Sequence, residues 1–135
     1  MIVADANIIA YLWIPGNEVY KSRELLTKDY NWWVPSLYRS EIRSVLLLHV
    51  RKEILLMKDA IYLMEKIENQ FEHSTMEVPS TLVLTLGHHS TCSAYDCEYA
   101  GLAMLLECSL ITHDKKLLHS FPELAMTPAT YLQRK

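Results

Sequence analysis

Residues 1–9 read Met-Ile-Val-Ala-Asp-Ala-Asn-Ile-Ile, and residues 110–114 read Leu-Ile-Thr-His-Asp. In each stretch a short apolar run, of the kind found in buried parallel strands, leads to an aspartate, Asp5 in the first and Asp114 in the second. Ligands of open α/β sheets bind beyond the carboxyl ends of the strands, so both aspartates are candidate functional residues. The two side chains would converge if the two strands are neighbours in the sheet.

The rest of the chain alternates between short apolar segments and longer amphipathic runs. Strands that are separated by helices argue for parallel βα units. We therefore expect an α/β fold, a three-layer α/β/α sandwich with a central, mainly parallel sheet of five strands, formed by a single domain over residues 1–135. The expected strands are 2–4, 32–34, 77–78, 110–112 and 125–127, and the expected helices are 17–28 with Asn17 as N-cap, 36–50, 52–73, 80–88, 93–108 and 115–119.

Composition narrows the function classes. The 135 residues are 50% apolar and 21% charged, which excludes a disordered or fibrous chain. A net charge of −3 gives no support for general electrostatic binding to nucleic acid, so any such binding must be local. Three cysteines suit a reducing compartment, and no apolar run approaches the roughly 20 residues that span a bilayer. We expect a cytoplasmic protein without membrane contact.

Glu41 interrupts the apolar face of the helix expected at residues 36–50. At the helical period it falls between Val45 and Leu48, inside the apolar arc. A charged side chain is rarely buried unless it is paired or binds a metal ion. The alternative is a glutamate at the edge of the apolar face that reaches solvent or pairs with an arginine.

Asp96 lies three residues after Ser93, a spacing close to that of a capping box at the start of the helix 93–108. Asp5 is likewise a suitable N-cap for the residues that follow it. However, this helix is apolar all round from Tyr99 to Leu106 and must be central. Its first turn would then point to the same sheet edge as Asp5, so a structural and a functional role are both open for each aspartate.

Four carboxylates at one edge of a sheet repel one another. Two unit charges 4–5 Å apart repel by about 4 kcal/mol at an effective dielectric constant of about 20. Some of the carboxyl groups must therefore stay protonated, or a cation must neutralise them. Oxygen ligands favour Mg²⁺ or Mn²⁺, and an ion of this kind can activate a water molecule to attack a phosphodiester.

Four segments, in this order along the chain, resemble the motifs of the PIN-domain family of metal-dependent ribonucleases, and of its small VapC-like toxins in particular. They are residues 1–7, residues 35–41 with Val45 and Leu46, residues 95–103 (Tyr-Asp-Cys-Glu-Tyr-Ala-Gly-Leu-Ala) and residues 110–117 (Leu-Ile-Thr-His-Asp-Lys-Lys-Leu). The resemblance covers nearly the whole chain and implies the sheet order 3-2-1-4-5. It implies that one or two Mg²⁺ or Mn²⁺ ions bind to the catalytic acids, and that two polar residues support those acids or position the substrate. The acids are Asp5, Glu41, Asp96 and Asp114, and the supporting residues are Asn7 and Thr112.

The same resemblance implies an activity and partners. The expected reaction is hydrolysis of single-stranded or loop RNA by a metal-activated water. Members of the family are often homodimers, and the toxins of type II toxin–antitoxin pairs are silenced by an antitoxin that blocks the site. Four basic residues near the acids in the sequence could contact RNA, or they could be ordinary charged side chains on a solvent-exposed face. They are Arg39, Arg43, Lys115 and Lys116.

Other functions are conceivable for a chain with an aspartate after its first strand. An aspartyl-phosphate phosphatase needs a second acid at position 7 and a pair of acids late in the chain. This chain has Asn7 instead, and no aspartate follows Asp114, so this class of enzyme is excluded. A catalytically silent PIN-like module that binds RNA or protein stays open. The family's usual small residue before the last aspartate is here His113, which could contact substrate, bind metal or be an ordinary loop residue.

Overall fold

The computed structural model describes residues 1–16 and 19–135, and these contain one sheet of five short strands. The strand order is β3-β2-β1-β4-β5, and every neighbouring pair is parallel. The predicted fold class and strand order are confirmed, and β1 lies directly beside β4. The strands are β1 (Ile2–Ala4), β2 (Trp32–Pro35), β3 (Thr75–Met76), β4 (Ser109–Ile111) and β5 (Ala125–Met126).

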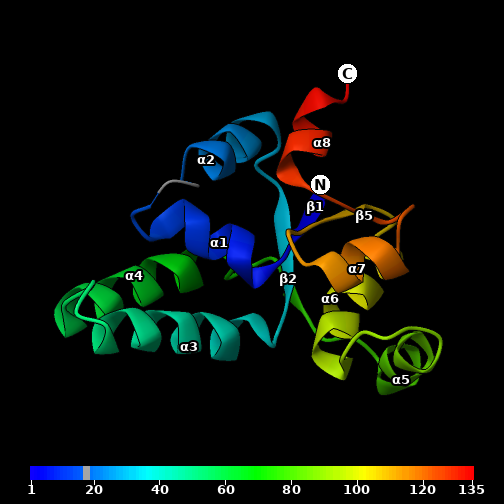
Figure 1. Ribbon diagram of the computed structural model, residues 1–135, viewed down its shortest axis with the longest axis horizontal. Helices are drawn as coiled ribbons and strands as arrows, with labels where there is room; N and C mark the ends of the chain where they lie inside the picture. The colour runs from blue at the N-terminus through cyan, green and yellow to red at the C-terminus, as the bar shows by residue number, and fades with distance from the viewer. Residues whose placement is uncertain (17–18) are drawn as a thin grey trace.

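Eight helices within the described residues cover both faces of the sheet (Figure 1). One layer contains α1 to α4, and the opposite layer contains α5, α6 and α7, while α8 packs against α2. The arrangement is the expected three-layer sandwich. The helices are α1 (Ala6–Trp13), α2 (Val19–Lys28), α3 (Tyr38–Arg51), α4 (Met57–Gln70), α5 (Ser80–His88), α6 (Ala94–Leu105), α7 (Lys115–Ser120) and α8 (Pro128–Gln133).

Two of the expected elements are placed differently. The strand expected at residues 77–78 is wrong, because the residues that pair with β2 are Thr75 and Met76 and the chain then runs without regular structure to Pro79, the N-cap of α5. The expected helix 52–73 begins only at Met57. The predicted N-cap Asn17 lies outside the described residues, and α8 was not anticipated.

The break between α3 and α4 has a local backbone cause. Glu53 has a φ of 59°, in the left-handed region that ends helices. This conformation reverses the chain, so that α4 folds back and packs on α3. No glycine or proline marks the turn in the sequence, which explains why the two helices were not separated there.

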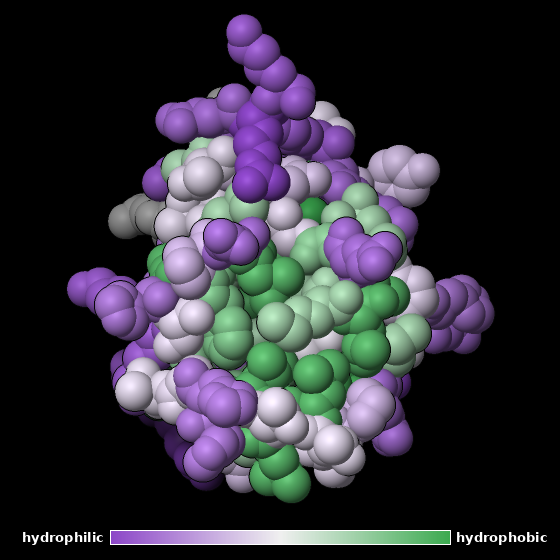
Figure 2. Space-filling model, turned by 90° about the vertical axis from the view of Figure 1, so that its right-hand side faces the viewer, coloured by the Kyte–Doolittle hydropathy of each residue, from purple (hydrophilic) through white to green (hydrophobic). Residues whose placement is uncertain are grey.

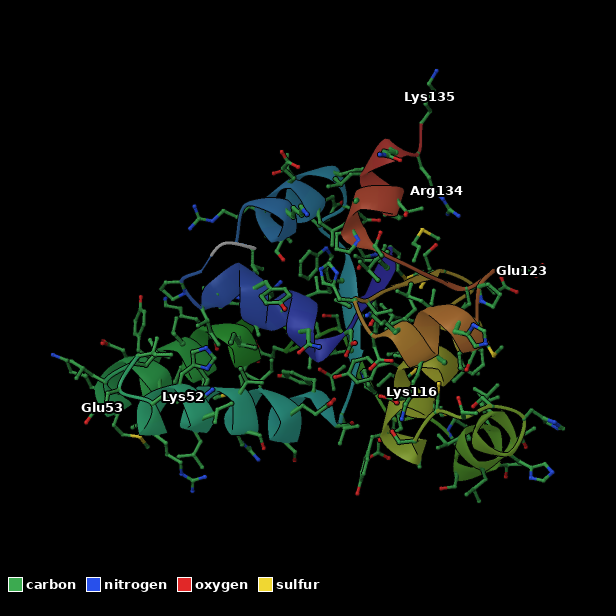
Figure 3. The ribbon with its side chains drawn as sticks, viewed as in Figure 1. Lys52, Glu53, Lys116, Glu123, Arg134 and Lys135 are labelled. Carbon is green, nitrogen blue, oxygen red and sulfur yellow. The ribbon has the colours of Figure 1, made fainter. Side chains whose placement is uncertain are left out.

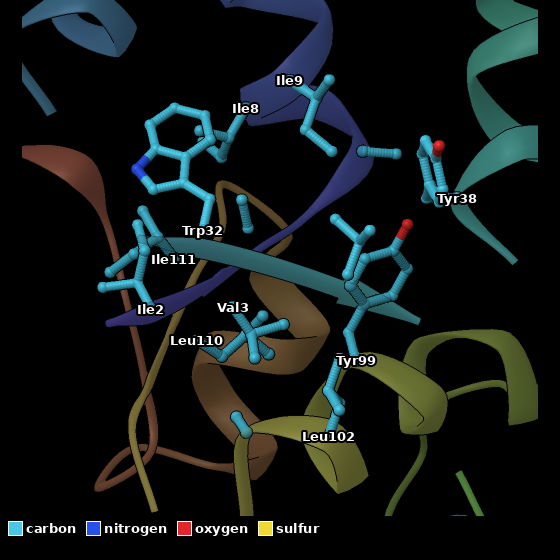
Figure 4. Packing of buried hydrophobic residues seen from close by; sticks show 14 of the residues in the cluster. Ile2, Val3, Ile8, Ile9, Trp32, Tyr38, Tyr99, Leu102, Leu110 and Ile111 are labelled. Atoms are coloured by element: carbon cyan, nitrogen blue, oxygen red, sulfur yellow. The ribbon is translucent and has the colours of Figure 1, made fainter. Parts of the chain in front are cut away.

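The central helix of the core is α6. Its residues from Tyr99 to Ala103 are all buried, and it contacts β1, β2 and β4. Figure 4 shows Tyr99 and Leu102 of α6 beside Val3 and Leu110 of the sheet. At Gly101 an added Cβ would lie 2.8 Å from Val78 Cγ1, so only glycine allows this approach. This packing fixes the first turn of α6, with Asp96, at the carboxyl edge of the sheet.

Figure 2 views the molecule from the side of α5, α6 and α7 and shows apolar side chains gathered on this face. Leu84 of α5 and Met104 and Leu105 of α6 are among the large apolar side chains that are exposed to solvent. Within the described residues, no helix is both long and apolar enough to cross a membrane.

Candidate functional site

Asp5 occupies the point where β1 turns into α1, and the residue is 7% exposed. Its Oδ1 accepts a hydrogen bond of 2.7 Å from the Ala6 amide, and its Oδ2 accepts one of 2.6 Å from the Thr112 hydroxyl. Burial raises the pKa of Asp5, and the nearby carboxylates of Asp114 and Asp96 raise it further. Asp5 therefore caps α1, and each of its oxygens keeps capacity to accept another bond.

Thr112 connects the two aspartates that follow neighbouring strands. Ala4 pairs with Ile111 in the sheet, so the residues after β1 and β4 meet at one edge. The Thr112 hydroxyl donates to Asp5 Oδ2 and accepts a 2.9 Å bond from the Asp114 amide, while Asp114 Oδ1 caps α7 by accepting from the Leu117 amide at 3.0 Å. The fully buried hydroxyl of Thr112 thus fixes the positions of the two acids relative to each other.

Glu41, in the first turn of α3, is partly buried, and its carboxylate lies near Tyr99 of α6. Its Oε1 is buried and has no hydrogen-bond partner among the described residues. The Tyr99 hydroxyl lies against this carboxylate, and it too lacks a partner of normal hydrogen-bond geometry. Burial raises the pKa of Glu41, the Tyr99 hydroxyl partly offsets this, and the carboxylates of Asp5 and Asp96 add to the rise.

Asp96 forms the capping box that its spacing suggests. The Ser93 hydroxyl accepts a bond of 3.1 Å from the Asp96 amide, and Asp96 Oδ2 accepts one of 3.3 Å from the Ser93 amide. The box stabilises the start of α6 and also fixes the direction of the carboxylate. Asp96 stays partly exposed, facing the same edge as the other acids.

Two adjoining hollows open at this edge of the molecule. The α3 pocket has a volume of about 620 Å³ and includes Glu41 in its wall. The α7 pocket has a volume of about 650 Å³ and includes Asp114. Asn7, Ser93 and Asp96 form the boundary that the two pockets share. Figure 3 shows Lys116 at this end of the molecule, next to α6, and Lys52 at the distant tip of the α3–α4 hairpin.

The four predicted acids therefore reach one edge, although they do not form a closed metal cage. No group of three or more His, Cys, Asp or Glu side chains is gathered closely enough to enclose an ion anywhere in the described chain. Mg²⁺ commonly keeps several waters and is held by only one or two carboxylates. The four acids offer only carboxylate oxygens as ligands, and Glu41 Oε1 is buried without a partner among the described residues. Both features fit a hard divalent ion of this kind.

Sequence reasoning missed two aromatic residues in the site. Tyr99 is buried against the Glu41 carboxylate, whereas the sequence places it in the apolar helix and in the motif at residues 95–103 without a role of its own. Its spacing of three residues from Asp96 is the available signal. Tyr11 lines the α7 pocket, and its ring lies edge-on to that of His113, with 5.7 Å between ring centroids and 68° between ring planes. Its position four residues after Asn7 places both on one face of α1.

Comparison with known proteins bears on this geometry. Residues 2–123 match the family model described as PIN domain. A protein named Ribonuclease VapC3, from Pyrobaculum aerophilum, is 29% identical over an alignment of 132 residues, which covers 94% of this chain and 98% of that protein.

Solved structures resemble the fold at lower sequence identity. PAE2754 from Pyrobaculum aerophilum matches with a TM-score of 0.76 and 20% identity, over 97% of this chain and 92% of that one. FitAcB from Neisseria gonorrhoeae matches with a TM-score of 0.73 and 18% identity, over 96% and 99%. A structure titled FitAB bound to IR36 DNA fragment matches with a TM-score of 0.72 and 15% identity, over 100% and 98%. These likenesses confirm the fold.

Proposed function

The chain belongs to the PIN domain family, and on that premise we propose that it is a metal-dependent endoribonuclease that acts as the toxin of a type II toxin–antitoxin pair. The observation that carries the proposal is the unpartnered, buried carboxylate oxygen of Glu41, which lies near the carboxylates of Asp5 and Asp96. Similarity to a protein named as a ribonuclease over nearly the full length supports the reaction class.

The residues have separate roles in this proposal. Asp5, Glu41, Asp96 and Asp114 would hold one or two Mg²⁺ or Mn²⁺ ions. When bound, such an ion supplies an activated water and neutralises charge on the phosphodiester. Thr112 keeps Asp5 and Asp114 at a fixed separation through its two hydrogen bonds.

The remaining groups act on the substrate and on Glu41. Asn7 lies on the boundary between the two pockets, where its exposed amide would orient a phosphate. Tyr99 would exclude water from the buried side of Glu41, because the residue is only 1% exposed. The raised pKa values of Asp5 and Glu41 mean that these two carboxyl groups are costly to ionise without a cation.

The proposed protein partners are an antitoxin and a second copy of the chain, in the cytoplasm. A groove of about 260 Å³ between α3 and α4 is apolar except for Arg43. Because α3 also carries Glu41 and lines the α3 pocket, an antitoxin segment seated in this groove would lie next to the acids. The exposed apolar side chains of α5 and α6 support self-association through the opposite face of the molecule. Sedimentation of the purified chain, alone and with the antitoxin, tests both partners.

The decisive experiment for the activity is cleavage of a mixed RNA pool with and without Mg²⁺ or Mn²⁺. Wild type should cleave only with the ion, and Asp5→Asn and Asp96→Asn should not cleave. Glu65→Gln, an exposed acid-to-amide change on α4, should cleave like wild type. RNA binding by wild type without cleavage under any of these conditions would favour the catalytically silent binding module.

A further inference from the structure

The α7 pocket contains groups that holding a metal ion does not require. We propose that Tyr11, His113, Lys115 and Lys116 form a nucleotide subsite, in which one unstacked base of a single-stranded RNA rests against Tyr11 and the backbone lies along the two lysines. The inference rests on the proposed ribonuclease function and adds to it the residues that bind the strand next to the scissile phosphate.

The aromatic wall is preorganised by a contact between distant parts of the chain. Tyr11 lies on α1, whereas His113 lies between β4 and α7. Their edge-on contact, with centroids 5.7 Å apart, restrains the Tyr11 ring, while 36% of the residue stays exposed at the pocket. A restrained and exposed aromatic ring suits base stacking, because every base has a π face and loses little by resting on it.

The cationic wall is available for phosphates. Lys115 and Lys116 are both exposed and line the pocket. Neither makes an ion pair or a side-chain hydrogen bond within the described part of the chain. In a protein with a net charge of −3, two unpaired cations next to the acids provide the local attraction that a polyanion needs.

The position of the pocket fixes how a strand would cross the site. The α7 pocket and the α3 pocket share the boundary formed by Asn7, Ser93 and Asp96. A phosphate held at this boundary places one neighbouring nucleotide in the α7 pocket. Stacking on Tyr11 requires a base that is free of its own helix, so the subsite selects single strands over duplex RNA.

The test measures binding apart from cleavage. A fluorescein-labelled, mixed-sequence RNA of eight nucleotides is titrated in EDTA, and its anisotropy is followed over a series of salt concentrations. Removal of both lysines (Lys115→Ala with Lys116→Ala) should lower the slope of log affinity against log salt by about 1.4, since each phosphate contact on a single strand contributes about 0.7. The matched control removes Lys52 and Lys58, two exposed lysines that do not line the pocket, and should leave the slope unchanged.

The aromatic half of the subsite gives a different signature. Tyr11→Ala should weaken binding by about 5-fold or more with an unchanged salt slope, whereas Tyr11→Phe should bind like wild type, because stacking depends on the ring. Tyr30→Ala, at a residue that is 87% exposed, is the control and should have no effect. A blunt RNA duplex should bind more weakly than the single strand. Thermal melting of each variant verifies that it is folded.

The outcomes separate this inference from the proposed function. If wild type cleaves RNA with Mn²⁺ while the Tyr11 and double-lysine variants bind and cleave as wild type does, the subsite is overturned and the nuclease stands. If the variants show the binding changes above but wild type cleaves no RNA with any divalent ion, the subsite is supported and the nuclease function fails. Equal binding of duplex and single strand would also overturn the subsite.

Discussion

The buried hydroxyl of Thr112 gives the sharpest test of how the acids are held in place. Thr112→Val keeps the side-chain shape and removes the donor to Asp5 Oδ2 and the acceptor for the Asp114 amide. Hydrogen bonds to charged groups contribute about 1.5–3 kcal/mol, and a buried amide left unsatisfied costs about 1–3 kcal/mol. The bond to Asp5 is buried, so water cannot replace it, whereas the bond from the Asp114 amide is part-buried. We therefore expect a loss of roughly 3 kcal/mol in the free energy of unfolding.

The assay is urea unfolding at pH 7 without divalent ions, followed by circular dichroism. The control is Thr85→Val, which removes a hydroxyl bonded to the Thr81 carbonyl on exposed α5 and should change stability by less than about 0.5 kcal/mol. Thr112→Ser keeps the hydroxyl and should recover most of the stability. If Thr112→Val unfolds at the same urea concentration as the Thr85→Val control, the linking role of Thr112 is refuted.

Three further predictions concern metal binding, packing and pH. At a Mn²⁺ concentration 100-fold above Kd, wild type should gain about 2.7 kcal/mol and melt several degrees higher by differential scanning fluorimetry, whereas Asp96→Asn should not shift; equal shifts would contradict the metal site. Gly101→Ala should lose about 1–3 kcal/mol in the free energy of unfolding, measured in urea, because the new Cβ meets Val78 at 2.8 Å. Gly16→Ala, whose new Cβ meets no atom within 4 Å, should unfold like wild type, and equal stabilities of the two variants would refute the tight packing of α6. Partial burial acts to raise the pKa of Asp29, yet hydrogen bonds from three donors lower it below 3.8. The stability that Asp29 provides is therefore present above pH 3.8 and is lost as the pH falls through the lowered pKa. In urea unfolding, the loss of stability in Asp29→Asn relative to wild type should be full near pH 6 and shrink toward pH 3, and a loss that does not change with pH would contradict the shift.

The sequence predicted the part of the site that depends on strands. Asp5 and Asp114 each follow a buried apolar run, and parallel pairing brings such positions to one edge whatever the helices do. Glu41 was identified because a charge inside an apolar arc needs a partner, and the structure buries its Oε1 without one. For Asp5 and Asp96 the capping roles are real, and the same local bonds that cap the helices also fix the directions of the carboxylates.

Features that depend on tertiary contacts were not predictable in this way. The turn at Glu53 uses a left-handed backbone on a residue that does not favour it, so no composition signal marked it. The strand β3 has only two residues, too few for a pattern. The contact between Tyr11 and His113 exists because β1 and β4 are adjacent, which brings the start of α1 beside the residues that follow β4.

The most direct test of the central claim is a Mn²⁺ titration of the metal-free protein, followed by the electron paramagnetic resonance signal of the free ion. The account predicts that wild type removes one or two equivalents of Mn²⁺ from solution, that Glu41→Gln loses this binding, and that Glu65→Gln on the exposed face of α4 retains it. Binding that is absent in wild type, or equal in all three proteins, would contradict the assignment of these carboxylates as metal ligands.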